Sequence, residues 1–284
     1  MTVAHEALVF PCAGAELVGI VHVPAVPDAT GVVIVVGGPQ YRVGSHRQFV
    51  HLADDLAAAG HATLRFDYRG MGDSAGEFRG FEAVGDDIAA AVAALRRAVP
   101  SVRRVVLWGL CDAATAAAFR GQHDATLAGL VLANPWVRTE AGLARSYVRH
   151  YYGNRLLQAE FWRRLLTGRV ALGRRLGEFL RDWRRARGGG VDVGVPAGPA
   201  PLPDRLRAAL AAYRGPVLLL LSGADLTARE FEGCFGEPGW EAVRRRPALT
   251  RVDLPAADHT FSGGAARAAV SAATLAWLRA LLPP

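Results

Sequence analysis

VVLWGLCDAA, from Val105 to Ala114, joins two kinds of segment. Its first part is apolar, and the residues that follow Cys111 are rich in alanine, a combination typical of a strand that turns directly into a helix. Gly109 and Ala113 flank the cysteine in a Gly-x-Cys-x-Ala pattern. A sharp strand-to-helix turn that exposes a nucleophile needs small neighbours at these two places. The segment therefore predicts a turn that holds the Cys111 thiol at the N-terminus of a helix.

A thiol at this place has a catalytic interpretation and a structural one. The N-terminus of a helix carries a partial positive charge and free N–H groups, and both stabilise a thiolate. Cys111 is therefore a candidate nucleophile. The alternative is a buried cysteine that only packs within a turn between a strand and a helix.

Segments of strand and helix character alternate in both directions from this turn. Eight strands are predicted, at Ala7–Pro11, Leu17–His22, Gly31–Val36, Ala62–Phe66, Arg104–Trp108, Gly129–Ala133, Pro216–Ser222 and Leu249–Leu254. Helical patterns are predicted at Arg47–Ala59, Gly80–Ala98, Ala113–Gln122 and Gly264–Leu282. Such alternation is typical of a parallel sheet with helices on both faces. The sequence therefore predicts an α/β fold with a mostly parallel eight-stranded sheet, whose first two strands form an antiparallel edge.

Two polar residues follow predicted strands in the second half of the chain. Asp225 lies just beyond the strand that ends at Ser222, and His259 lies between the last strand and the last helix. Catalytic groups gather at the carboxyl ends of strands in open α/β sheets. The order Cys111, Asp225, His259 is the nucleophile–acid–base order of the α/β-hydrolase fold, which is therefore the predicted fold. In this arrangement His259 moves the thiol proton and Asp225 orients the imidazole.

Each of these two residues also has a plain structural explanation. Asp225 is in position to cap a helix over Leu226–Phe235, and His259 is in position to lie in an ordinary loop. Asp258 is a second acid, next to the proposed base in the chain. The order of Cys111, Asp225 and His259 favours the catalytic interpretation.

The loop after the third strand, Val36–Gln40, is a candidate for the oxyanion hole. Such a hole needs one backbone N–H from this loop and one from the residue after the nucleophile. Asp112 supplies the second N–H. Pro39 has none, so Gly38 is predicted to supply the first, with Gln40 as the alternative. A simple Gly-Pro turn is the structural explanation.

Polar residues near this loop are candidates for substrate binding. Gln40, Arg42, His46 and Arg47 follow the Gly-Gly-Pro turn, and they are predicted either to line the mouth of the site or to form ordinary surface.

No metal and no cofactor are expected. The eight histidines are scattered, without the ligand spacing of a metal site. Gly70, Gly72 and Ala75 fit a dinucleotide fingerprint only loosely, because the residues after them do not open a helix.

One segment interrupts the alternation of strands and helices. Residues 138–213 are interpreted as a helical lid inserted into a core of residues 1–137 and 214–284. Arg138–Arg187 contains 13 arginines and 4 acidic residues. The net positive charge of this segment is larger than the net charge of the whole chain, which is +7. Glycines and prolines at about 188–203 indicate a flexible linker.

The composition favours a cytoplasmic protein. No apolar run reaches the roughly 18 residues that cross a bilayer, and the N-terminus lacks the basic and apolar regions of a signal peptide. Three cysteines do not make a disulfide framework.

Three motifs resemble those of a known group. Asp67–Ser74 resembles the D-x-R-G-x-G-x-S signature of the α/β-hydrolase superfamily, and Gly37–Pro39 is similar to the oxyanion loop of its serine aminopeptidase-like branch. Gly37–Phe49 together with Trp108–Ala114 resembles the exosortase A system-associated hydrolase 1 family. That resemblance implies acyl chemistry linked to exopolysaccharide production and exosortase protein sorting.

The expected function is hydrolysis of an acyl ester or thioester through a Cys-His-Asp triad. An acyltransferase on the same triad and a non-catalytic binding partner with a hydrolase fold are the alternatives. The expected partners are a small acyl substrate and the acyl carrier protein or coenzyme A that carries it as a thioester. Contact of the basic insertion with a membrane surface is a further option, whereas no motif indicates nucleic acid.

Overall fold

The computed structural model describes residues 3–38, 40–138 and 200–281. The chain divides into two compact units, of which residues 1–138 and 202–284 form one, and residues 139–201 form the other. The predicted lid and linker between 139 and 199 lie outside the described residues. Within the residues that are described, no helix combines the length and the apolar character needed to span a membrane.

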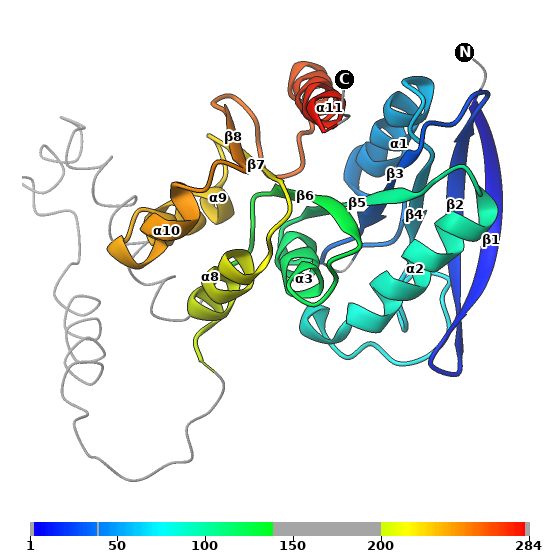
Figure 1. Cartoon of the computed structure of the whole chain (residues 1–284), viewed down its shortest axis with the longest axis horizontal. Coiled ribbons are helices and arrows are strands. Elements are labelled where there is room, and N and C mark those ends of the chain that lie inside the picture. Colours follow the sequence, from blue (N-terminus) through cyan, green and yellow to red (C-terminus); the bar gives the residue numbers. More distant parts are fainter. Residues whose placement is uncertain (1–2, 39, 139–199, 282–284) are drawn as a thin grey trace, which may run out of the picture. The chain divides into compact units, whose positions relative to one another are not determined.

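An eight-stranded sheet forms the centre of the larger unit (Figure 1). The strand order is β1-β2-β4-β3-β5-β6-β7-β8; β1 and β2 pair antiparallel, as do β2 and β4, and every other pair is parallel. The strands are β1 (Val3–Cys12), β2 (Ala15–Pro24), β3 (Thr30–Val35), β4 (Thr63–Phe66), β5 (Arg104–Leu110), β6 (Leu127–Ala133), β7 (Val217–Ser222) and β8 (Leu249–Leu254). The predicted α/β-hydrolase fold and its antiparallel edge are confirmed.

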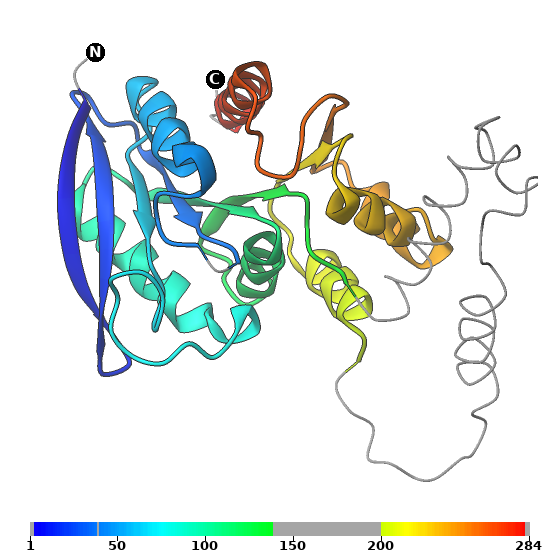
Figure 2. The same cartoon turned by 180° about the vertical axis from the view of Figure 1, so that it is seen from behind.

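Helices cover both faces of the sheet, as Figures 1 and 2 show from opposite sides. One face carries α1 (Gln48–Ala58) and α11 (Gly264–Ala280), and the other carries α2 (Gly85–Ala98), α3 (Asp112–Gly121) and α8 (Leu202–Ala212). Among the described residues, the other helices follow β7: α9 (Leu226–Phe235) and the short α10 (Glu241–Arg244). Single 3-10 turns occur at Ser45–Arg47, Phe81–Ala83 and Pro238–Trp240.

The buried side chains form two cores, one on each face of the sheet. In β3, Val33 and Val35 belong to the core that includes residues of α2, α3 and α8. Val32 and Ile34 belong to the core that includes residues of α1 and α11. Neighbouring residues of a strand point to opposite faces, so an apolar strand such as β3 supplies both cores at once.

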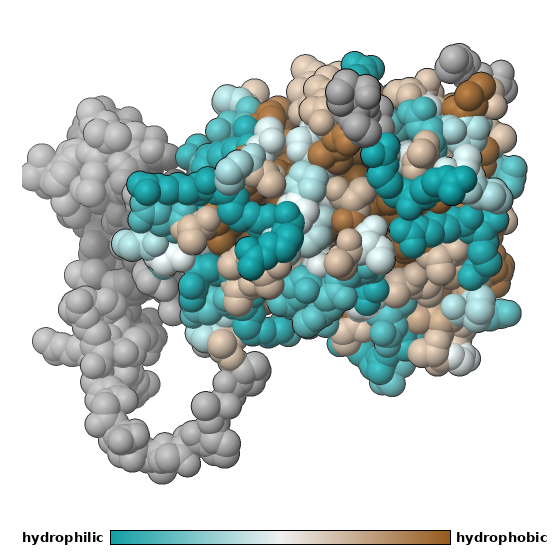
Figure 3. Space-filling view, viewed as in Figure 1, coloured by the Kyte–Doolittle hydropathy of each residue, from teal (hydrophilic) through white to brown (hydrophobic). Residues whose placement is uncertain are grey.

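The outer surface is mixed in character. On the face shown in Figure 3, small apolar areas lie among larger hydrophilic ones, the clearest of them between α11 and α1. Scattered apolar surface of this kind is ordinary for a folded chain.

Several elements differ in their bounds from the sequence-based expectation, and the differences at α2 and α8 affect the architecture most. The helix expected from Gly80 begins at Gly85, because a 3-10 turn at Phe81–Ala83 precedes it. Residues 202–212, which the prediction placed in the insertion, form α8 of the larger unit. Leu206 and Leu210 lie one helical turn apart and are buried in the main core, and their burial fixes this helix on the sheet.

Candidate active site

Cys111 occupies a strained turn between β5 and α3, as its sequence context predicts. Its backbone has φ 63° and ψ −125°, and it is the N-cap residue of α3. The turn is fixed by backbone hydrogen bonds, since the Cys111 N–H donates to Ala133 O (2.9 Å) and the Cys111 carbonyl accepts from Trp136 N (3.1 Å). A Cβ atom at Gly109 would lie 2.5 Å from the Ala113 carbonyl oxygen, so only glycine fits at this position. The half-buried thiol is thus held at the carboxyl edge of the sheet.

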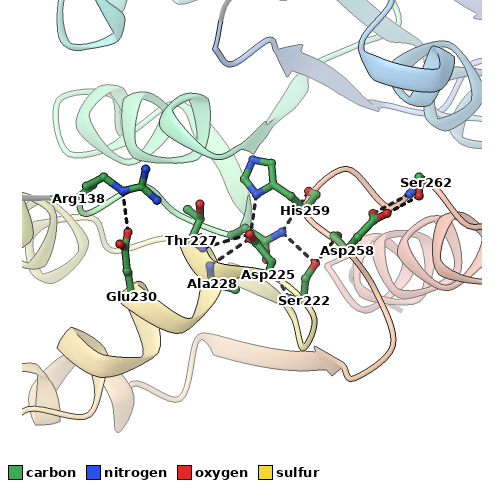
Figure 4. Close-up of polar contacts among 10 residues, drawn as sticks. Arg138, Ser222, Asp225, Thr227, Ala228, Glu230, Asp258, His259 and Ser262 are labelled. Carbon is green, nitrogen blue, oxygen red and sulfur yellow. Dashed lines mark hydrogen bonds and ion pairs between the residues drawn. The ribbon is translucent and has the colours of Figure 1, made fainter. Parts of the chain in front are cut away.

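Asp225 and His259 meet at the same edge of the sheet (Figure 4). His259 Nδ1 lies 2.8 Å from Asp225 Oδ2, and the two side chains come from the loops after β7 and β8. Asp225 also caps α9, because its carboxylate accepts hydrogen bonds from Thr227 N and Ala228 N, each at 3.1 Å. The catalytic and the helix-capping interpretations of Asp225 are therefore compatible: the cap fixes the carboxylate, and the carboxylate favours the Nδ1–H tautomer of the imidazole.

The contacts of His259 favour its charged form. Hydrogen bonds with Asp225 and with the Cys111 thiol, in that order of size, raise the pKa of His259 to about 10 against the opposing effect of burial. These contacts therefore favour the protonated imidazole. A cation beside a cysteine stabilises the thiolate, which is the reactive form of the side chain.

Asp258, the competing acid, turns away from the imidazole. It accepts hydrogen bonds from Ser262 N (2.8 Å) and from the Ser262 hydroxyl, as Figure 4 shows. These two bonds lower the pKa of the Asp258 carboxyl. Asp258 thus closes the turn that precedes α11, while Asp225 serves the histidine.

The sequence did not point to Asn134, a buried residue that links the end of β6 to Ser222 in β7 and to the loop that carries His259. Its side-chain amide donates to Ser222 Oγ (2.9 Å) and to the His259 carbonyl oxygen (3.3 Å), and its Oδ1 accepts from Ser222 N (2.9 Å). Ser222 Oγ in turn donates to the Asp258 carbonyl oxygen (3.0 Å). Asn134 has a left-handed φ of 45°, which asparagine tolerates better than most residues, and this is the one local signal for its role.

Both residues predicted to form the oxyanion hole face each other, but one of the two N–H groups has a partner from the chain itself. The Gly38 N–H donates to Asp112 Oδ1 at 2.7 Å. Burial is the largest effect on the Asp112 carboxyl and raises its pKa, although hydrogen bonds from the Gly38, Ala113 and Asp112 N–H groups act in the opposite direction. A carboxyl side chain therefore lies where the sequence predicts a binding place for substrate oxygen.

Two of the four residues predicted to bind substrate are engaged within the fold. Gln40 Oε1 accepts a hydrogen bond from Ser45 N (3.0 Å). The Arg42 guanidinium bonds to Asp67 and to Asp73 Oδ2 (2.6 Å), so it ties the loop after β3 to the loop after β4.

The other two of these residues, His46 and Arg47, are exposed and adopt left-handed backbone conformations, with φ 53° and φ 58°. The charge of His46 lowers the pKa of Asp258, so His46 lies near the loop that carries His259.

A cluster of His5, His22 and Asp54 brings three metal-binding side chains together. His5 Nε2 and His22 Nδ1 lie 2.7 and 2.8 Å from the same oxygen, Asp54 Oδ1, and His22 Nε2 accepts a hydrogen bond of 2.8 Å from Arg65 Nε. Burial, followed by the nearby Arg65 charge, lowers the pKa of His22 to about 4. Both ring nitrogens of the neutral His22 are thus engaged, and the donor from Arg65 requires the ring proton on Nδ1, the atom that faces the cluster. This hydrogen-bonded arrangement does not fit a metal ion.

A family model matches most of the chain. The model described as serine aminopeptidase, S33, covers residues 27–230. That range contains Cys111 and Asp225 and ends before His259.

Solved structures of similar fold include enzymes that act on esters and peptides. The esterase Pf2001 of Pyrococcus furiosus has a TM-score of 0.65 at 14% identity, over 98% of this chain and 93% of its own. The proline iminopeptidase of Mycobacterium smegmatis has a TM-score of 0.60 at 15% identity, over 97% and 98%. Est1E of Butyrivibrio proteoclasticus, with ferulic acid bound, has a TM-score of 0.63 at 16% identity, over 97% and 99%. At these identities the likeness concerns the fold.

Two curated relatives align over a short part of the chain. Peptide deformylase 3 of Streptomyces avermitilis is 35% identical over 91 residues, and peptide deformylase 1 of Streptomyces coelicolor is 37% identical over 91 residues. Each alignment covers 28% of this chain, and it covers 40% and 41% of the two deformylases. The chain thus spans about two fifths of the length of the curated relatives it matches.

Proposed function

The chain belongs to the serine aminopeptidase S33 family, and we propose that it hydrolyses acyl esters or thioesters through a covalent intermediate on Cys111. One observation carries the proposal: His259 Nδ1 lies 2.8 Å from Asp225 Oδ2, and the pKa of this imidazole is raised both by Asp225 and by the Cys111 thiol at the β5–α3 turn. Acyl transfer of this kind requires a nucleophile beside a base, and an acid that orients the base.

The proposed reaction has two halves. The Cys111 thiolate adds to the acyl carbon, forming a carbon–sulfur bond and moving the carbonyl electron pair onto oxygen. When the tetrahedral intermediate collapses, the bond to the leaving group breaks and His259 gives it a proton. A water molecule then gives a proton to His259 and attacks the acyl-cysteine, which releases the carboxylic acid and restores the thiolate.

A cysteine nucleophile favours activated acyl donors. The acyl-cysteine is itself a thioester, so transfer from another thioester is close to balanced in free energy, whereas transfer from an amide is uphill. We therefore propose a thioester of coenzyme A or of an acyl carrier protein as the donor. The resemblance to the exosortase A system-associated hydrolase 1 family supports a role beside exopolysaccharide production, and the excess positive charge of Arg138–Arg187 suits an anionic carrier.

Steady-state hydrolysis tests this proposal. The wild type, Cys111→Ala and His259→Ala are compared on p-nitrophenyl esters and on acyl thioesters that carry the same acyl groups. We expect turnover in the wild type, with higher kcat/KM on the thioesters, and a loss of at least about a thousandfold in either variant. Turnover that survives in Cys111→Ala would refute the role of the cysteine. Consumption of the thioester only when an alcohol or amine acceptor is present would identify an acyltransferase instead.

A further inference from the structure

The carboxyl group of Asp112 lies at the place where a tetrahedral oxyanion would be bound. Asp112 is the first residue of α3, and its Oδ1 accepts the 2.7 Å hydrogen bond from Gly38 N. The N–H groups of Ala113 and of Asp112 itself also act on this carboxyl group. The amides that the sequence predicts for the oxyanion hole therefore already lie against a carboxyl group of the chain itself.

The fit of this carboxyl group depends on the residue opposite. A Cβ atom at Gly37 would lie 2.4 Å from Asp112 Oδ1 and 2.5 Å from the Leu110 carbonyl oxygen. Only glycine allows the loop after β3 to come so close to the β5–α3 turn. The close packing of the loop against Asp112 therefore requires glycine at position 37.

We propose that Asp112 is a specificity-determining residue, because its carboxylate competes with the substrate for the oxyanion hole and must release the Gly38 N–H during each turnover. This inference rests on the proposed function. A neutral carbonyl oxygen is a weaker acceptor than a carboxylate, since hydrogen bonds to charged groups are roughly twice as strong. The carbonyl oxygen becomes a comparable acceptor only when the Cys111 sulfur bonds to the acyl carbon and the electron pair moves onto oxygen.

The competition selects among acyl donors. A thioester carbonyl is electron-poor and is attacked without much help from the hole, whereas an alkyl ester depends on the hole to stabilise its oxyanion. A filled hole therefore disfavours alkyl esters more than it disfavours thioesters. Asp112 narrows the substrate class to activated acyl groups.

Charged groups around Asp112 set the strength of this competition. His259, from the loop before α11, favours the ionised carboxyl, while burial disfavours it and is the larger effect. The buried Tyr68, from the loop after β4, has its own pKa raised in part by the Asp112 charge, and Cys111 is the adjacent residue in the chain. Protonation of Asp112 would weaken the competitor, so acylation by alkyl esters is expected to rise as the carboxyl group is protonated.

Two substitutions separate the space that the side chain fills from its charge. Asp112→Ala removes the competitor and frees the Gly38 N–H. Asp112→Asn keeps an oxygen that accepts from Gly38 but removes the charge. We expect Asp112→Ala to acylate with an alkyl ester about tenfold faster or more, with a smaller gain for the thioester. Asp112→Asn should show an intermediate gain with the alkyl ester, because its neutral oxygen is a weaker competitor than the carboxylate. No gain in Asp112→Ala, or an equal gain with the alkyl ester and with the thioester, would overturn the proposal.

A second measurement does not depend on activity. In the wild type, the NMR shift of the Gly38 amide proton should follow the ionisation of Asp112, and in Asp112→Ala this titration should vanish. A Gly38 amide shift that does not change with the ionisation of Asp112 would show that the contact on which the inference rests is absent. If the contact is present but no acyl adduct forms on the wild type, Asp112→Ala or Asp112→Asn, the proposed function fails, and the competition by Asp112 fails with it. If the wild type forms adducts but Asp112→Ala forms them no faster, only the competition by Asp112 is overturned and the proposed function stands.

Discussion

The pKa of His259 is raised by Asp225 and by the Cys111 thiol, and under the proposed function this suits a cysteine at position 111. A serine hydroxyl must give its proton to a neutral imidazole, whereas a thiol can lose its proton in advance and form an ion pair. The high pKa of His259, about 10, favours the second arrangement. The nucleophile and the base are in this way matched to each other.

The pKa of His259 should respond to both partners. Asp225→Asn removes the largest cause of its elevation and Cys111→Ala the second, so both variants should titrate below the wild type, and Asp225→Asn further below. The imidazole C–H proton in NMR spectra recorded against pH gives these values directly. An unchanged value in Cys111→Ala would show that the thiol does not contact the ring.

The same shift predicts how stability depends on pH. The folded-state pKa of about 10 lies above the ordinary value of 6.5, so the protonated form is favoured by folding. This contribution is complete below pH 6.5 and is lost as the pH rises from 6.5 through about 10. Urea unfolding of the wild type across this range should show a decline that is smaller in His259→Gln. Equal declines in the two proteins would contradict the assignment.

Asn134 is expected to act on catalysis through the position of His259. Asn134→Ala leaves the Ser222 N–H without its partner and places alanine in a left-handed conformation, which should cost about 2–4 kcal/mol of unfolding free energy. It should lower kcat while KM stays nearly constant, because substrate contacts are unaffected. Asn134→Asp, which keeps the acceptor for Ser222 N, should recover part of the stability. A change in KM alone would contradict the positioning role.

At single residues, the sequence predicted the positions of three candidate side chains but not the contacts that hold the loops around them. Cys111, Asp225 and His259 could be chosen because each follows a strand in a known order. The hydrogen bonds of Asn134 and the bond from Gly38 N to Asp112 could not be predicted in this way. Each of them joins loops that are brought together only by the order of the strands in the sheet. Side-chain bonds between distant loops leave no periodic pattern in a sequence.

The loop after β4 is held by a buried ion pair. Arg69 Nε and Nη2 bond to the two oxygens of Asp87 at 2.9 and 2.6 Å, and the Arg69 N–H donates to Asp87 Oδ1 at 2.9 Å. These contacts fasten the D-x-R-G-x-G-x-S turn to α2. The turn that resembles a superfamily signature thus has a structural role in this chain.

Removal of one partner from this pair should be costly. Asp87→Ala leaves Arg69 buried without its main partner and should lower the unfolding free energy by about 3–5 kcal/mol. Asp86→Ala is the matched control, since Asp86 is exposed, lies 3.9 Å from the same guanidinium and should contribute less than about 1 kcal/mol. Denaturant unfolding followed by circular dichroism measures both. Equal effects of the two substitutions would contradict the role of the buried pair.

Elements with a simple period were predicted well. Buried strands such as β3 and β7 show as short apolar runs, and β8 was predicted with its observed bounds. The start of α2 was missed because the residues of the 3-10 turn, Phe81–Ala83, also fit a helical pattern. Helix α8 was assigned to the insertion because it follows a Gly- and Pro-rich segment, and only its packing against the core reveals where it belongs.

On the scale of the whole molecule, charge is unevenly distributed along the chain. The net charge is +7, and Arg138–Arg187 holds 13 arginines against 4 acidic residues. We expect kcat/KM on a coenzyme A thioester to fall several-fold between low salt and about 0.5 M salt, because ions screen the attraction to the anionic carrier. A p-nitrophenyl ester of the same acyl group carries no such charge and serves as the control. An equal salt dependence for both substrates would contradict electrostatic attraction of the carrier.

The fold could be predicted from the sequence almost entirely, because alternating strands and helices admit few arrangements and parallel crossovers have one hand. The residues that form the site follow from the same rule, since the carboxyl ends of β5, β7 and β8 meet at one edge. The substrate does not follow from it, because acyl specificity depends on side chains that no strand pattern positions.

The central claim is that Cys111 carries the acyl group, and intact-mass spectrometry tests it most directly. The wild type and Cys111→Ala are mixed with an excess of an acyl thioester, quenched in acid within seconds and weighed, and the modified peptide is sequenced. The account predicts a mass increase of one acyl group in the wild type, located at Cys111, which accumulates further in His259→Ala if acylation persists there, and no increase in Cys111→Ala. An adduct of equal amount in Cys111→Ala, or one located at another residue, would contradict it.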